Sequence, residues 1–213
     1  VPYDLEDIAP DGPLREAFIA LQAPWTERGV SRWLGLLTPA SSRPLLVNGA
    51  WSREHEPRLV GTMVGLWHPT VLDRFDTVFE PEATPSLSAD ARPDHGCWHF
   101  ISVTIAQGWQ GRGLGRRMVR HALQSLRECS PKVIARTLSP ALGLADALGT
   151  SDGASVSPAV LEAAVHGLPI VRFHCANGAT LDAILPGSRS DDLASARVNL
   201  RFAYELPDGP VAS

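Results

Sequence analysis

The stretch that decides the fold reads Gln110-Gly111-Arg112-Gly113-Leu114-Gly115. Its three alternating glycines let the backbone turn tightly and approach a ligand without Cβ atoms in the way. A strongly helical sequence, 114–126, follows directly, so free amide groups and the positive end of a helix dipole point at the turn. Such an arrangement binds phosphate groups. We therefore predict a pyrophosphate site at residues 110–116, with Arg112 and Arg116 as charge-assisted donors.

Two other phosphate-binding patterns do not fit this turn. A dinucleotide-binding turn has GxGxxG spacing and an acidic residue roughly twenty positions later. Here the glycines follow GxGxG, and the later position is occupied by Ala135. A Walker loop needs GK[ST], which the chain lacks. The remaining plain interpretation is a glycine-rich turn that only caps a helix.

The residues around the turn predict a mixed central sheet with helices on both faces. Strands are predicted at 44–51, 59–67, 97–105, 132–138, 170–174 and 196–205. Helices are predicted at 14–21, 27–37, 114–126 and 158–166. The Pro/Asp/Ser-rich stretch 69–94 and the Gly/Ala/Ser-rich stretch 139–155 are predicted as connections, and the role of the first is unexplained.

Composition limits the classes of partner. A chain of 213 residues suits one domain, and 44% hydrophobic with 20% charged residues is ordinary for a globular protein. A net charge of −4 gives no reason to expect nucleic acid. The sequence has no long apolar run for a membrane. Three widely spaced cysteines favour a reducing cytoplasm. The Val1 start and the Pro/Gly-rich end predict a domain cut from a larger polypeptide.

The Gln110-x-x-Gly113-x-Gly115 pattern, after a strand and before a helix, resembles the acyl-CoA signature of the GNAT acetyltransferase superfamily. The resemblance implies a GNAT core over 45–205, preceded by a helical segment over 1–44. It implies that strand residues before the loop pair with pantetheine amides and that the loop holds the pyrophosphate. The next strand would splay away to leave a slot for the thioester. The cofactor-binding residues so implied are Val103, Thr104, Ile105, Gln110, Gly111, Arg112, Gly113, Leu114, Gly115 and Arg116.

Ordinary amine acetylation fits this chain poorly. Many members of the superfamily carry a tyrosine in a Y-x-x-x-G-F pattern, and it protonates the departing thiolate. If Gly167 is the corresponding glycine, the tyrosine position is Ala163. The only tyrosines, Tyr3 and Tyr204, lie far from it in sequence. The strand before the loop also offers no carboxylate as an amine base, so we expect a different reaction.

The remaining polar residues resemble those of GNAT-like decarboxylase domains from polyketide synthase loading modules. The resemblance implies that Thr137 and His174 are catalytic and that Arg189 and Trp33 bind substrate, with Trp25 competing for the last role. The implied reaction is decarboxylation of a malonyl, methylmalonyl or dimethylmalonyl thioester to make a polyketide starter unit. The acyl group would be carried on CoA or on the phosphopantetheine of an acyl carrier protein. Neighbouring synthase domains would be partners, and neither a metal nor a redox cofactor would be needed.

Each of these assignments has a structural alternative. His174, predicted at the end of a strand, is equally a core histidine, and Arg189 next to Asp191 and Asp192 is equally half of a loop ion pair. His95, Cys97 and His99 suggest a metal but lack a fourth ligand nearby. Two functional alternatives also stay open. One is an S- or N-acyltransferase that uses acyl-CoA with His174 as base, and the other is an inactive acyl-CoA-binding module.

Overall fold

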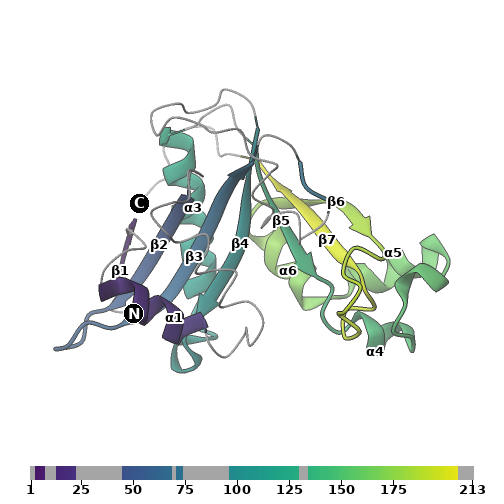
Figure 1. Ribbon diagram of the computed structural model, residues 1–213, viewed down its shortest axis with the longest axis horizontal. Coiled ribbons are helices and arrows are strands. Elements are labelled where there is room, and N and C mark those ends of the chain that lie inside the picture. The colour runs from purple at the N-terminus through teal and green to yellow at the C-terminus, as the bar shows by residue number, and fades with distance from the viewer. Residues whose placement is uncertain are drawn as a thin grey trace.

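The computed structural model describes residues 3–7, 13–22, 45–68, 71–73, 96–129 and 134–205. Within them, seven strands form one sheet in the order β1-β2-β3-β4-β5-β7-β6 (Figure 1). The strands are β1 (Tyr3–Asp7), β2 (Leu45–Ser52), β3 (Leu59–His68), β4 (Cys97–Ile105), β5 (Ile134–Pro140), β6 (Ala179–Leu185) and β7 (Asn199–Tyr204). The helices are α1 (Pro13–Gln22), α3 (Leu114–Cys129), α4 (Leu144–Leu148), α5 (Pro158–His166) and α6 (Pro169–Ala176), with 3-10 turns η4 (Gln107–Trp109) and η5 (Gly153–Ser155).

The sheet opens between β4 and β5. Among the described strands these are the two neighbours that run parallel, and α3 lies on the crossover that a parallel pair requires. Their pairing begins at Cys97 with Ile134 and ends at Phe100 with Thr137, although both strands continue. Figure 1 shows them together at one end and well apart at the other. We call the opening between the unpaired parts of β4 and β5 the slot.

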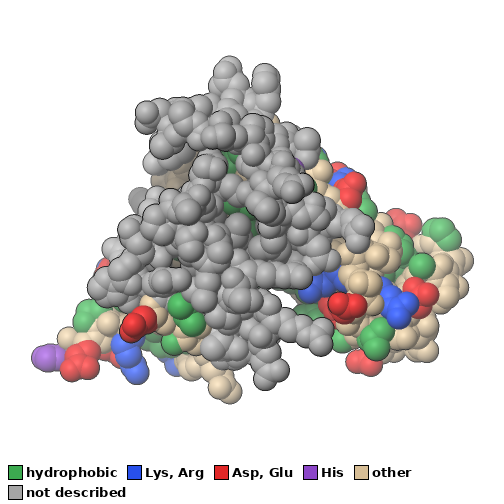
Figure 2. Space-filling view, in the orientation of Figure 1, with side chains coloured by type: hydrophobic (Ala, Val, Ile, Leu, Met, Phe, Trp, Pro, Cys, Tyr) green, Lys and Arg blue, Asp and Glu red, His purple; other side chains and the backbone are tan. Residues whose placement is uncertain are grey.

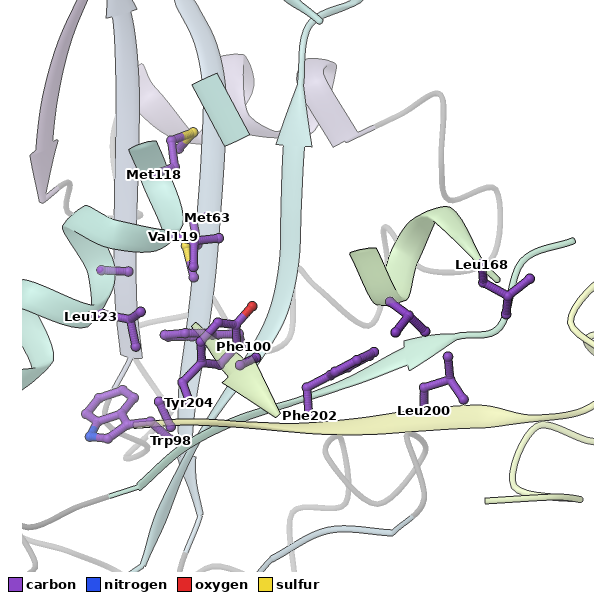
Figure 3. Close-up of a cluster of buried hydrophobic side chains, with 14 of the residues drawn as sticks. Met63, Trp98, Phe100, Met118, Val119, Leu123, Leu168, Leu200, Phe202 and Tyr204 are labelled. Atoms are coloured by element: carbon purple, nitrogen blue, oxygen red, sulfur yellow. The ribbon is translucent and has the colours of Figure 1, made fainter. Parts of the chain in front are cut away.

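Helices cover both faces of the sheet, as the sequence predicts. One face carries α3, α5 and α6 over the larger core, part of which Figure 3 shows, with Met118 and Leu123 of α3 on one side and Phe202 and Leu200 of β7 on the other. The opposite face carries α1, whose Phe18 packs in a second cluster with residues of β2, β3 and β5. The mixed, splayed sheet of the GNAT type is therefore confirmed.

Helix α3 fixes the phosphate loop against the sheet. Its Met118, Val119, Ala122 and Leu126 recur at helical spacing and are all buried. Full burial of a Met, Val or Leu side chain contributes roughly 1.5–3 kcal/mol each. Gly61 of β3 makes room for the helix, since a Cβ there would meet the Met118 sulfur at 2.8 Å.

The predicted strand 170–174 is wrong, because these residues lie in helix α6. Pro169 occupies the first turn, where the missing N–H of proline costs nothing. Val171 and His174, three positions apart, are the buried residues of one helical face. A short apolar run with β-branched residues reads equally as strand or buried helix, and packing against the sheet decides between them.

Other boundaries hold to within a few residues. Strand 97–105 and helix 158–166 match β4 and α5. Two strands and one α-helix have no predicted counterpart: β1 at the start of the sheet, β6, which begins after Gly178 at φ +85°, and α4 inside the expected connection 139–155. The predicted helix 27–37 lies outside the described residues.

Candidate functional site

The phosphate loop, residues 110–116, has the backbone geometry that its glycines predict. Gly111 and Gly113 adopt φ values of +72° and +76°, in the left-handed region that favours glycine. The first bond of helix α3 runs from the Arg117 N–H to the Gly113 carbonyl at 3.2 Å. The N–H groups of residues 114–116 therefore have no acceptor within the helix. Beside them Arg112 is exposed, and its guanidinium carbon lies over the Trp109 ring, 5.4 Å from the centroid.

The loop is tied to the rest of the site through β4 and α6. The Gln110 side chain donates from Nε2 to the Ile105 carbonyl at 3.0 Å, which joins the loop to the end of β4. A Cβ on Gly115 would lie 3.7 Å from Phe173 and 3.8 Å from Val103. Phe173 precedes His174 on α6. The phosphate loop and the predicted histidine are thus separated by a single packed side chain.

The strand β4 continues along the slot beyond its last pair with β5. Val103, Thr104 and Ile105 pair with β3 and have no partner on β5. Ile101 lies at a bulge just past the last β4–β5 pair and belongs to neither ladder. That residues 103–105 pair with pantetheine amides stays a prediction.

His174 is buried on α6 at the centre of a hydrogen-bonded chain. Its Nε2 lies 2.9 Å from the Ser139 Oγ of β5, and its Nδ1 lies 2.6 Å from the Tyr204 hydroxyl of β7. The ring stacks on Phe202, with centroids 4.3 Å apart. The exposed fractions of Ser139, His174 and Tyr204 are 7%, 6% and 2%. We call these three residues the triad.

Burial keeps the triad uncharged. It lowers the pKa of His174 from 6.5 to about 4, because an imidazolium would lose its hydration there. Burial also raises the pKa of the Tyr204 phenol, with a further contribution from Cys175. At neutral pH one ring nitrogen of His174 therefore donates a hydrogen bond and the other accepts one. Figure 3 shows the Tyr204 hydroxyl between β4 and β7, within the apolar cluster.

The β5 hydroxyl that contacts His174 is that of Ser139, a residue the sequence analysis did not select. Thr137 instead donates from Oγ1 to the Phe100 carbonyl at 2.8 Å, where β4 and β5 part. Thr137 and Ser139 are two positions apart on one strand and so lie on the same face, which is the signal that could have indicated Ser139. Tyr204 carried no comparable signal, since thirty positions separate it from His174.

The predicted substrate-binding residues are not brought to the triad by any described contact. The Arg189 guanidinium lies 3.1 Å from an Asp192 carboxylate oxygen in the loop after β6. Trp33, its competitor Trp25 and His95 lie outside the described residues. The substrate-binding roles of Arg189 and Trp33 therefore stay predictions.

The sheet face opposite the triad carries compensated charges. Strand alternation points Arg136 and Arg201 away from the triad face. Arg201 donates to Asp182 at 2.7 Å and also pairs with Asp73, while Arg136 lies 3.6 Å from Asp182. Figure 2 shows acidic and basic side chains side by side over the right-hand part of this face. Because these charges cancel, the cluster differs from the phosphate loop, whose Arg112 and Arg116 make no described ion pair.

A hollow of about 540 Å³ lies away from the phosphate loop and from the triad. It is lined by Gly153, Ala154, Val156, Pro158, Leu161, Glu162, Ile184 and Pro186. None of these belongs to the phosphate loop, β4 or the triad, so this hollow is not the slot.

In the described parts of the chain, His, Cys, Asp and Glu form no cluster of three suited to a metal. No helix among them has the length and apolarity needed to cross a membrane.

Comparison with known proteins gives one family and several related folds. The model of the acetyltransferase (GNAT) family matches residues 14–149. Among curated protein sequences, none matches this chain. Solved structures of the same fold include aminoglycoside 6'-N-acetyltransferases, one of them from Enterococcus faecium.

Three further structures resemble the chain over nearly its whole length. The loading GNATL domain of CurA from Lyngbya majuscula has a TM-score of 0.68 and 16% identity, covering 97% of this chain and 98% of its own. Malonyl-CoA decarboxylase from Agrobacterium vitis has a TM-score of 0.70 and 18% sequence identity. This match covers 97% of the present chain but only 61% of the decarboxylase chain. The GphF GNAT-like decarboxylase, in complex with isobutyryl-CoA, has a TM-score of 0.59 and 15% sequence identity. This match covers 96% of the present chain and 100% of the GphF chain. At these identities the likeness establishes the fold alone.

Proposed function

Because the chain belongs to the GNAT acetyltransferase family, we propose that it binds an acyl thioester in the slot and removes CO₂ from a malonyl-type acyl group there. The phosphate loop would hold the pyrophosphate of CoA or the phosphate of a carrier-bound pantetheine. The observation that carries this proposal is the uncharged triad beside the slot. Malonyl-CoA decarboxylases and GNAT-like loading domains among the structures of this fold support it further.

The triad supplies a hydrogen-bond donor for the negative charge that CO₂ loss creates. The electrons of the broken C–C bond move into an enolate, whose charge lies on the thioester oxygen. If Tyr204 donates to His174 Nδ1, then the Nε2–H donates to Ser139 Oγ. The Ser139 O–H is then left to donate toward the acyl oxygen. One such preorganised donor is worth about 3 kcal/mol of barrier.

Neutral donors suit this reaction better than they suit amine acetylation. Among the described contacts of His174 there is no carboxylate that could accept a proton from an ammonium substrate. An apolar enclosure by Phe173 and Phe202 disfavours a bound carboxylate more than its neutral product, CO₂. Acyl transfer is nevertheless a second candidate, because Tyr204 is a buried phenol within the site. In that reaction Tyr204 would replace the tyrosine acid that many family members carry at the position of Ala163.

Several finer parts of the proposal rest on the resemblance and the fold. We propose an acyl carrier protein as one donor of the substrate and a starter unit for polyketide synthesis as the product. Thr137 is proposed as a further donor, and Arg189 and Trp33 are proposed to bind the substrate. A reducing cytoplasm remains the expected compartment, and the thiols of Cys97 and Cys175 are free.

Mass spectrometry of loaded substrates tests the proposal. Malonyl- and methylmalonyl-CoA, and the same groups on a carrier protein, are incubated with the protein and followed for loss of the mass of CO₂. We expect this loss with the parent and a much slower loss with a folded His174→Ala variant. Intact malonyl groups after incubation, together with acetylation of an added amine by acetyl-CoA, would replace the decarboxylase by the acyltransferase.

A further inference from the structure

Helix α3 carries a row of positive charge that continues past the phosphate loop. Arg112 precedes the helix, and Arg116, Arg117 and Arg120 lie in its first two turns. All four side chains are exposed. No aspartate or glutamate occurs in the sequence between residues 106 and 127, although the whole chain has a net charge of −4. We call Arg116, Arg117 and Arg120 the arginine face.

The positions of these arginines do not serve the helix itself. Cations in a first turn oppose the helix dipole, and like charges four positions apart, such as Arg116 and Arg120, repel each other. On the turn between β2 and β3, by contrast, Arg58 pairs with Glu54 at the same spacing. None of the described ion pairs gives Arg116 or Arg120 an anionic partner. An anionic ligand would relieve this repulsion.

The phosphate loop accounts for only part of the arginine face. A phosphate would lie against the free N–H groups of residues 114–116, beside Arg112 and Arg116. Arg120 lies six positions after Leu114, which is about 9 Å along the helix axis. Its charge therefore lies beyond one phosphate, toward the group to which that phosphate is attached.

A carrier protein has to place its own surface at this position. Its phosphopantetheine arm is esterified to a serine, so a phosphate in the loop brings the carrier surface around that serine against the start of α3. The exposed cations at this contact are Arg112 and the arginine face. A complementary carrier surface is therefore acidic. A long polyanion such as nucleic acid fits less well, because the net charge of the whole chain is −4.

We infer that the arginine face docks the acidic surface of an acyl carrier protein, with Arg120 contacting the carrier itself and not its pantetheine arm. This inference rests on the proposed binding of an acyl thioester in the slot, but it does not require CO₂ loss. Exposed charges at the rim of an interface act mainly on the rate of association, and salt screens them. The arginine face thus favours acyl groups on a carrier protein over the same groups on CoA.

Binding of a carrier protein and of CoA to charge-reversed variants tests this inference. The probe is an acidic acyl carrier protein whose pantetheine arm bears an acetyl amide in place of the thioester, so that no turnover occurs. Arg120→Glu should weaken binding of this carrier by about tenfold or more and change CoA affinity by less than about twofold. The matched control is Arg127→Glu in the last turn of α3, about 20 Å along the axis from Leu114, which should leave both affinities unchanged.

A charge swap keeps the test decisive. A carrier whose acidic residues beside the modified serine are replaced by lysine should bind the parent poorly and Arg120→Glu better. Higher ionic strength should weaken carrier binding by the parent more than by Arg120→Glu. Carrier binding that responds to neither charge change would overturn the inference, as would a parent that binds CoA but not the carrier. Equal losses of carrier and CoA affinity in Arg120→Glu would assign Arg120 to the CoA nucleotide and also overturn it.

The outcomes separate this inference from the proposed function. Carrier binding that responds as expected, without any loss of CO₂, would keep the arginine face as a docking surface and reject decarboxylation. Loss of CO₂ from both substrates, with carrier binding that Arg120→Glu does not change, would keep the proposed function and reject the docking surface. Failure of the parent to bind either CoA or the carrier would reject both.

Discussion

The phosphate loop is exposed and presents backbone amides, whereas the triad is buried and presents side chains. The loop is continuous in sequence, with a left-handed Gly113 at its centre. The triad brings together β5, α6 and β7 from positions 139, 174 and 204. Binding a phosphate needs only local geometry and a helix end. Placing a neutral histidine between two hydroxyls needs a core that excludes water. The two regions should therefore respond to substitution independently.

The largest expected effect is on the loop. Gly113→Asp should abolish measurable CoA binding, because the new residue is strained at φ +76° and brings a negative charge to the phosphate. Calorimetric titration with CoA measures this. Gly108→Ala is the matched control, since a Cβ at Gly108 meets open space. CoA binding by Gly113→Asp at the parental affinity would show that the loop is only a helix cap.

The next effect is on the triad. Ser139→Ala and His174→Ala should each slow decarboxylation by roughly one to three decades while CoA affinity hardly changes. The double variant should lose less than the product of the two, because both residues serve one oxygen. Single-turnover rates and CoA titrations measure the two properties.

Thr137→Val sharpens this test, since Thr137 is the hydroxyl that the sequence analysis selected. Its hydroxyl is bonded to the Phe100 carbonyl, so we expect a smaller loss of rate than for Ser139→Ala. An equal or larger loss would show that Thr137 turns toward the acyl group in the bound state. A parental rate in a folded His174→Ala protein would make His174 a core histidine.

The smallest effect is on stability as a function of pH. The unfolded chain protonates His174 near pH 6.5, while the folded chain keeps it neutral down to about pH 4. Between these values the unfolded state binds the extra proton, so the free energy of unfolding falls as the pH falls. The groups around the ring, Ser139, Tyr204, Phe173 and Phe202, carry no charge in this range. We expect His174 to account for a loss of roughly 2–3 kcal/mol between pH 7 and pH 4.5.

Denaturant unfolding at the two pH values measures this contribution. His174→Gln should flatten the decline, and the exposed His166→Gln is the control that should leave it unchanged. An equally steep decline in His174→Gln would mean that other groups cause the acid sensitivity.

The sequence predicted most of what is local. The GxGxG turn fixed its own conformation and the start of α3, because glycine at positive φ and a helix N-terminus are properties of neighbouring residues. Strand β4 matched its predicted range because a β-branched, apolar run between turn signals indicates a strand. The weaker predictions concern short segments such as 170–174, because a short apolar run suits a strand and a buried helix equally well.

What the sequence by itself determined is thus the glycine turn that opens α3 and five of the seven strands of the central sheet, β2, β3, β4, β5 and β7. Tertiary structure alone decided that His174 lies on a helix, that Ser139 rather than Thr137 faces it, and that Tyr204 holds its other nitrogen. Hydrogen bonds between residues thirty or more positions apart leave no pattern in the chain. They exist because burial removes water from these polar groups, and each must then find its partner within the protein.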